Sequence, residues 1–162
     1  MILQDIKDFA ITKEACNSQL IPFSEAIEKE NETEAWSIVL GNFVWLKGRR
    51  LGINLEDILS HTNIAKTYYV KGQIYEQYTY NSIGLRQGLY QRWHYNGKLC
   101  TQFVYNSEGL RQGLYQSWHK NGQLCTQFVY NSKGLRQGLY QSWHKNGQIY
   151  EQYTYDSKGK II

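Results

Sequence analysis

The sequence lacks most features of a secreted or membrane-spanning protein. It has one proline, three cysteines and no CxxC pair in 162 residues. Cys16, Cys100 and Cys125 are an odd number at wide spacing, which favours a reducing compartment over a disulfide framework. The longest apolar stretch, Trp36 to Leu46, spans 11 residues, against about 20 for a bilayer-spanning helix. The first residues mix acids and lysines where a signal peptide would be apolar, so we expect a soluble cytoplasmic protein.

Motifs of catalysis are also missing. The chain contains no Gly-rich phosphate loop, no HExxH, no GxSxG and no paired catalytic carboxylates. We therefore expect no enzyme activity, no catalytic residue and no cofactor.

Tyrosine is absent before Tyr68, and the charge balance changes at about the same point. Residues 1–63 carry ten acidic and six basic groups, a net charge of −4, whereas the rest carries four acidic and twelve basic groups, a net charge of +8. This split predicts two regions, a helical module over residues 1–63 and a second region over residues 64–162.

The second region repeats with a 25-residue period, and a fixed period determines the whole architecture. Repeat units start near Tyr68, Gly88, Gly113 and Gly138. The recurring positions are Gly88, Trp93, Asn96 and Gly97, then Gly113, Trp118, Asn121 and Gly122, then Gly138, Trp143, Asn146 and Gly147. Each unit has two runs rich in aromatic and β-branched residues, joined by Asn-Gly, which predicts an antiparallel hairpin with a two-residue type I′ turn.

A two-residue turn also predicts which residues face each other within a hairpin. The expected pairs are Leu89 with Val104, Tyr90 with Phe103, Gln91 with Gln102, Arg92 with Thr101, Trp93 with Cys100 and His94 with Leu99. Both faces of the ribbon are then part apolar and part polar, so we expect the aromatic residues to stack from repeat to repeat, as in a solenoid.

These units resemble MORN repeats, in the divergent form of antitoxin-like bacterial proteins and giant-virus proteins. The matching positions of one unit are Gly88, Trp93, Asn96, Gly97, Leu99, Tyr105 and Gly113. The resemblance covers about residues 68–160, and departs from the family where YNSxGLRQG replaces a shorter Y-x-N-G return. It implies an elongated β-hairpin ribbon that binds proteins, and in some members acidic lipids, without catalysis.

The N-terminal region is expected to be helical, which makes the fold class α+β. Acids precede bases between Ser24 and Arg50, as the helix dipole favours, and Gly41-Asn42 is a plausible interruption. A first helix should end before Pro22, and Asn54 should cap a short helix reaching about His61. Such helices can cover the open first edge of the ribbon.

Several side chains of the repeats are candidates for a site. Cys100 and Cys125 are equivalent positions two strands apart, about 9 to 10 Å, too far for a disulfide. Equal spacing likewise separates His94, His119 and His144, so we expect no metal site, and we expect the tryptophans to pack within the sheet without binding nucleic acid. The candidate partner- or anion-binding residues are basic: Arg86, Arg111, Arg136, Lys120 and Lys145.

The leading hypothesis is a non-enzymatic scaffold that binds a protein partner. One alternative is attachment to acidic phospholipid surfaces through the arginines, which would place the protein peripherally at membranes. Another is antitoxin-like neutralisation of a partner protein, and a viral source would place it in the host cytoplasm. A free C-terminal edge at Tyr150 to Tyr155 can also pair with its copy in a homodimer.

Overall fold

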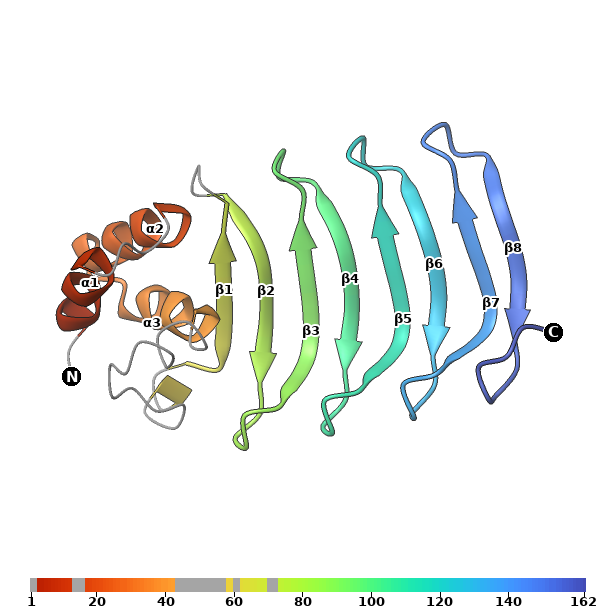
Figure 1. Cartoon of the computed structure of the whole chain (residues 1–162), viewed down its shortest axis with the longest axis horizontal. Helices are drawn as coiled ribbons and strands as arrows, with labels where there is room; N and C mark the ends of the chain where they lie inside the picture. The colour runs from red at the N-terminus through yellow and green to blue at the C-terminus, as the bar shows by residue number, and fades with distance from the viewer. Residues whose placement is uncertain (1–2, 13–16, 43–57, 60–61, 70–72) are drawn as a thin grey trace. The chain divides into compact units, whose positions relative to one another are not determined.

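The computed structural model describes residues 3–12, 17–42, 58–59, 62–69 and 73–162, and divides the chain into two compact units, Met1–Gly84 and Leu85–Ile162. Within these described ranges, three named helices precede eight antiparallel strands (Figure 1), so the α+β fold with hairpin repeats is confirmed. Composition placed a boundary at residue 63, where the strands begin, but the first hairpin clusters with the helices because α3 packs against β1. None of the described helices has the length and apolarity that a bilayer crossing requires.

The first unit consists of α1 (Leu3–Thr12), α2 (Asn17–Glu28), α3 (Glu32–Gly41), β1 (Ile64–Tyr68) and β2 (Ile74–Tyr80). Asn31 caps α3 by accepting a hydrogen bond from the Glu34 N–H at 3.1 Å. Every residue of α3 from Ala35 to Leu40 is buried, and the core is completed by Ile6, Phe23, Ala26, Ile58, Ala65 and Tyr78. The helices therefore pack on one another and against β1, as expected of a helical module next to the first strand.

Two helix predictions were confirmed and one helix was missed. Helix α1 ends before Pro22, and α3 ends at Gly41 with Asn42 as its C-cap. The sequence analysis did not find α2, which runs through Pro22. Proline removes one backbone hydrogen bond from a helix, and burial of Phe23 and Ala26 on the same helix offsets that loss. The predicted cap at Asn54 lies outside the described residues.

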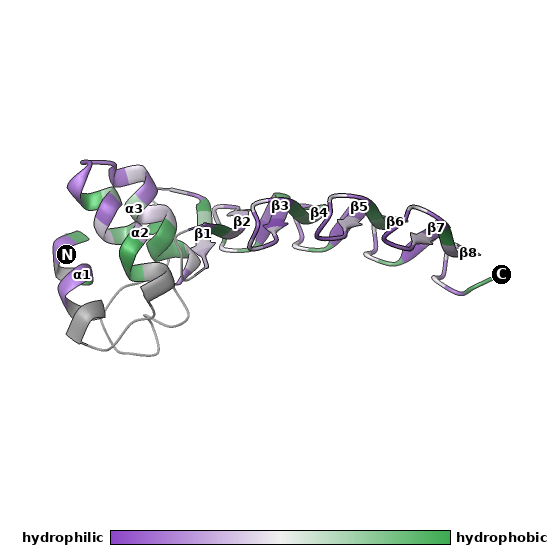
Figure 2. Ribbon diagram, turned by 90° about the horizontal axis from the view of Figure 1, so that it is seen from above, coloured by the Kyte–Doolittle hydropathy of each residue, from purple (hydrophilic) through white to green (hydrophobic). Residues whose placement is uncertain are grey.

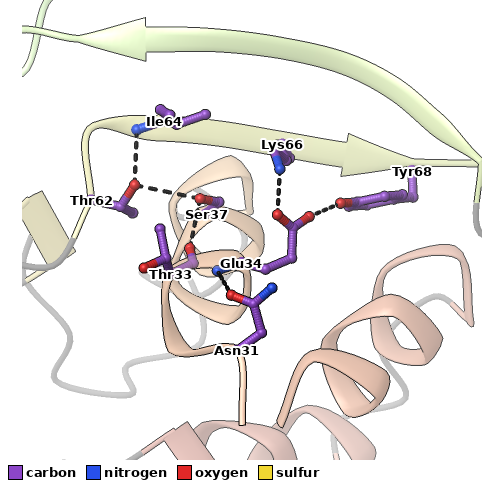
Figure 3. Close-up of polar contacts among 8 residues, drawn as sticks. All are labelled: Asn31, Thr33, Glu34, Ser37, Thr62, Ile64, Lys66 and Tyr68. Carbon is purple, nitrogen blue, oxygen red and sulfur yellow. Dashed lines mark hydrogen bonds and ion pairs between the residues drawn. The ribbon is translucent and has the colours of Figure 1, made fainter. Parts of the chain in front are cut away.

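Polar contacts join α3 to β1 (Figure 3). The Glu34 carboxylate accepts hydrogen bonds from the Lys66 ammonium and the Tyr68 hydroxyl. Burial, together with the bond to Glu34, raises the pKa of Tyr68. The Ser37 hydroxyl donates to the Thr33 carbonyl at 2.8 Å and lies 3.4 Å from the Thr62 hydroxyl. These contacts fix the helix against the strand.

The second unit consists of three hairpins built from strands that are neighbours in chain order. The strands are β3 (Arg86–Trp93), β4 (Leu99–Tyr105), β5 (Arg111–Trp118), β6 (Leu124–Tyr130), β7 (Arg136–Trp143) and β8 (Ile149–Tyr155). They form a single layer (Figure 2). The 25-residue period thus produces one hairpin per repeat, as predicted.

The hairpin turn differs from the prediction. The Gly97 N–H donates to the His94 carbonyl at 2.9 Å, and the His94 N–H donates to the Lys98 carbonyl at 2.8 Å. Only the glycine has a positive φ, 78°, whereas a type I′ turn needs a positive φ at both central residues. The loop is therefore a three-residue type I turn with a left-handed glycine. The Asn96 side chain accepts from the Lys98 N–H at 3.2 Å and donates to the Lys120 carbonyl of the next repeat at 2.8 Å. The third hairpin makes the same turn with no repeat after it, so contacts within the turn are sufficient to form it.

The predicted strand register is confirmed in the body of the hairpin and wrong at its end. Four pairs match the prediction: Leu89 with Val104, Tyr90 with Phe103, Gln91 with Gln102 and Arg92 with Thr101. Trp93, however, lies opposite Leu99, and His94 lies beyond the strand. The longer turn shifts the pairing by one residue, and a bulge at Cys100 shifts it back. Equivalent bulges occur at Tyr75, Cys125 and Tyr150.

The return between repeats uses a similar three-residue turn. The Gly109 N–H donates to the Asn106 carbonyl at 3.1 Å, and the Asn106 side chain accepts from the N–H groups of Glu108 and Leu110 at 3.0 and 2.9 Å. The register between β4 and β5 then shifts close to Gly113, whose φ is 72°. Hairpin turns and return turns consequently lie at opposite ends of the strands (Figure 1).

Candidate interaction surface

The two faces of the second unit carry different side chains, because successive residues of a strand point to opposite sides. One face, here the aromatic face, carries six rings. They belong to Tyr90, Phe103, Tyr115, Phe128, Tyr140 and Tyr153. The other, here the aliphatic face, carries leucine, valine and glutamine at the alternate positions.

The six rings stack in one continuous column. Ring centroids are 4.6 Å apart within each hairpin and 5.7–5.8 Å apart between hairpins. A second ring of each repeat packs edge-on against the column; the Tyr105 centroid, for example, lies 5.0 Å from the Phe103 centroid. Phe103 and Phe128 are consequently only 4% and 3% exposed in a single-layer sheet. The predicted stacking from repeat to repeat is confirmed, and it supplies the core of this unit.

The predicted arginines lie at the starts of β3, β5 and β7, and Arg111 and Arg136 lie against this column. The Arg111 guanidinium lies 4.9 Å from the Phe103 ring centroid and donates to the Tyr130 hydroxyl at 3.1 Å. Arg136 repeats the arrangement, 4.7 Å from the Phe128 centroid and 2.8 Å from the Tyr155 hydroxyl. The hydrogen bond that Arg111 donates to the Tyr130 hydroxyl raises the pKa of Arg111 above its usual value. These arginines thus stabilise the ribbon through cation–π contacts and hydrogen bonds.

The predicted lysines lie at the opposite end of the strands, so the basic candidates form two separate groups. Lys120 and Lys145 are exposed in the hairpin turns after β5 and β7. The Lys120 ammonium lies 5.1 Å from the ring centroid of Tyr95 in the preceding turn. The tryptophans end β3, β5 and β7 in equivalent places, half-buried, and Trp118 and Trp143 face Leu124 and Ile149.

Histidine and asparagine side chains tie each hairpin turn to the next repeat. The His94 Nε2 lies 2.8 Å from the Trp118 carbonyl, and the His119 Nε2 lies 2.8 Å from the Trp143 carbonyl. A carbonyl only accepts, so these nitrogens carry the proton. Asn121 donates to the Lys145 carbonyl at 2.8 Å. The column of histidines is therefore a set of contacts between repeats.

Cysteine and metal-ligating residues form no cluster in the part of the chain that the structure describes. Cys100 and Cys125 are free thiols at the bulges, and Cys16 lies outside the described residues. Over the same described ranges, no three residues among histidine, cysteine, aspartate and glutamate are placed to hold a metal ion.

The aliphatic face exposes a row of branched side chains. Its members are Leu89, Val104, Leu114, Val129 and Leu139, each between 42% and 47% exposed. Next to the row, paired glutamine side chains are hydrogen-bonded at 2.9–3.0 Å across each hairpin. The sequence analysis paired these residues correctly, but it did not identify the row as a candidate site. Its signal was the recurrence of leucine and valine at the 25-residue period on one predicted face.

Comparison with known proteins identifies the repeats. A family model described as a MORN repeat variant matches residues 86–107, 111–132 and 136–157. No curated protein matches the chain. Among solved structures, the chain is similar to one titled as the crystal structure of accessory secretory protein 1,2 and 3 in Streptococcus pneumoniae, and to one titled as a GtfA/B complex bound to UDP and GlcNAc.

Both likenesses are limited. The identities are 17% and 13% over 60% and 57% of this chain, with a TM-score of 0.33 in each case. This chain spans only 19% and 22% of the length of those two chains.

Proposed function

Since residues 86–157 of this chain are three MORN repeat variant units, we propose that the protein is a non-enzymatic scaffold that binds a protein partner on the aliphatic face. The observation that carries the proposal is the exposed row of leucine and valine, which recurs in each hairpin on one side of the sheet. Contiguous apolar patches on a soluble domain mark interaction sites. Duplicated repeats lengthen such a patch without building an asymmetric active site.

The charge distribution favours a protein over an anionic partner on this face. The positions of β3–β8 that share the face with the row hold leucine, isoleucine, valine, threonine, glutamine and tryptophan, and no charged residue. Binding to acidic lipids or nucleic acids depends on lysine and arginine. The partner that fits is therefore a protein that presents an apolar strip, with polar groups to meet the glutamine ladder.

The basic groups lie elsewhere and are partly engaged. The Arg111 and Arg136 guanidinium groups contact aromatic rings and tyrosine hydroxyls of their own ribbon. These internal contacts favour a structural role for the arginines over the alternative of attachment to acidic lipids.

Negative charges introduced into the exposed row of the aliphatic face should abolish partner binding. Leu89, Leu114 and Leu139 are each replaced by Asp, and the matched control replaces Ser107, Ser132 and Ser157 by Asp at the return turns. Both variants add three negative charges, but only the first places them in the row. A partner captured from native lysate and verified by titration of the purified pair should bind the control like the wild-type protein and lose the Leu→Asp variant.

Equal binding by both variants would refute the aliphatic face as the site. Vesicles with and without anionic lipid test the alternative. Salt-sensitive co-sedimentation with anionic vesicles that survives the Leu→Asp changes would contradict the proposal in favour of lipid attachment. The identity of a captured protein decides whether the scaffold neutralises it in an antitoxin-like way.

A further inference from the structure

One position of the aromatic face holds an arginine in the first repeat and a serine in the other two. The first repeat has Arg92, while the second and third have Ser117 and Ser142. The Arg92 guanidinium reaches across its hairpin, 3.4 Å from the Thr101 hydroxyl and 3.7 Å from the Cys100 sulfur. Replacement of an arginine by a serine leaves the place of a guanidinium unfilled in the later repeats.

An open pocket of about 840 Å³ lies over this place in the third repeat. Ser142, Glu151, Tyr140, Trp143 and Tyr150 contribute to its lining. Ser142 is 7% exposed, and its buried hydroxyl has no hydrogen-bond partner among the described residues. A buried hydroxyl without a partner is costly, so the site offers an unused polar group to a ligand.

The third repeat also changes the residue across the strand. Where Arg92 faces Thr101, Ser142 faces Glu151. The third repeat therefore has a serine in place of the arginine and a carboxylate at the cross-strand position. Lys145, on the exposed turn, also lines the pocket, and its positive charge repels a bound cation. His119 and His144 are two further titratable residues of the lining.

The geometry points to a binding pocket for an arginine side chain of a protein partner. A guanidinium in the place of the Arg92 head group donates to the Ser142 hydroxyl and the Glu151 carboxylate, and its planar face fits against the exposed ring of Tyr150. Arginine suits this lining better than lysine because it stacks on aromatic rings and donates in two directions at once. The pocket lies on the aromatic face, so the inference goes beyond the proposed function and names a second contact for a protein partner, on the side of the sheet opposite the aliphatic row.

The direct test uses N-acetyl-L-arginine methylamide as the probe and the full chain as the receptor. The backbone amide resonances of Ser142 and Glu151 should shift on titration. The citrulline analogue has the same shape but no charge, and it should bind at least about fivefold more weakly. Equal shifts with the citrulline analogue, or none with the arginine probe, would overturn the pocket.

Two variants localise the binding. Ser142→Arg restores the residue of the first repeat, which this fold accommodates at Arg92, and should abolish the shift while the thermal unfolding midpoint stays near that of the wild type. Glu151→Gln keeps the size of the side chain and should weaken binding about fivefold or more. Probe binding that both variants leave unchanged would place the ligand elsewhere and refute the inference.

The same variants separate this inference from the proposed function. If a protein partner binds Ser142→Arg and Glu151→Gln as tightly as the wild type, and the probe shifts no resonance at Ser142 or Glu151, the scaffold proposal stands and the pocket is rejected. Probe binding that depends on both residues, without any partner on the aliphatic face, retains the pocket and rejects the scaffold proposal.

Discussion

Replacement of Gly41 by alanine should loosen the first unit. Gly41 ends α3 where the helix meets β1. A Cβ atom there would lie 2.1 Å from the Lys66 carbonyl oxygen and 2.7 Å from its carbonyl carbon. Both atoms belong to the backbone of a paired strand, so neither can rotate away as a flexible side chain would.

The size of the effect follows from the displacement that the new atom requires. Ordinary contact begins at 3.4 Å, so helix and strand must separate by roughly 1.3 Å. That movement would lengthen the Ser37–Thr62 contact, already 3.4 Å, and the bonds of Glu34 to β1. Overpacking costs about 1 to 3 kcal/mol, and the gain in helix propensity from glycine to alanine is at most about 1 kcal/mol. We expect a net loss of about 2 kcal/mol from the free energy of unfolding.

Native-state hydrogen exchange of α3 and β1 measures this loss locally. A decrease of about 2 kcal/mol corresponds to about 30-fold faster exchange of amides that open with the unit. Gly113→Ala is the matched control, because its φ of 72° is strained for alanine although nothing lies within 4 Å of the added Cβ. Its cost should be about 1 to 2 kcal/mol, confined to the strands around β5. Exchange in α3 and β1 that changes less than about threefold would refute the close-approach argument.

Two further predictions test the aromatic column and the contact of α3 with β1. Phe103→Ala should lower the free energy of unfolding by about 3 to 5 kcal/mol, since the ring is 4% exposed between two stacked neighbours. Tyr153 is half-buried in the last strand, so Tyr153→Ala should lower it by less. Equal losses for the two variants in denaturant unfolding would argue against the column. The pKa of Tyr68 is raised by burial and by its bond to Glu34. The unfolded chain therefore releases this proton at a lower pH than the folded protein does. The part of the unfolding free energy that comes from the neutral Tyr68 hydroxyl is lost as the pH rises above about 10. The alkaline decrease in the unfolding free energy should therefore be smaller in Tyr68→Phe than in the wild type, and identical pH profiles would contradict it.

The hairpin repeats and their register could be predicted because they depend on local pattern. The fixed period, the alternation along each strand and the position of Asn-Gly are properties of short segments, and they determined the pairing of Tyr90 with Phe103. The turn itself could not be predicted from the dipeptide. Asn-Gly fits both kinds of turn, and the choice depends on the strand pairing beyond it: Trp93 lies opposite Leu99, and the Cys100 bulge takes up the extra residue of the turn.

The candidate site was predicted in part. The sequence identified the basic residues, but only the structure placed the arginines against aromatic rings and left the aliphatic row exposed. The presence of Ser142 at the position equivalent to Arg92 was visible in the repeats, whereas the pocket over it depends on which side chains of neighbouring strands and turns come together there.

The sequence alone therefore determined that this chain forms side-by-side hairpins, because repetition and alternation act within a few residues. The tertiary structure decided which rings are buried, how α2 tolerates Pro22 and why Gly41 must lack a side chain. Those features depend on contacts between segments far apart in the chain, where a small difference in the approach of two backbones determines which side chains fit.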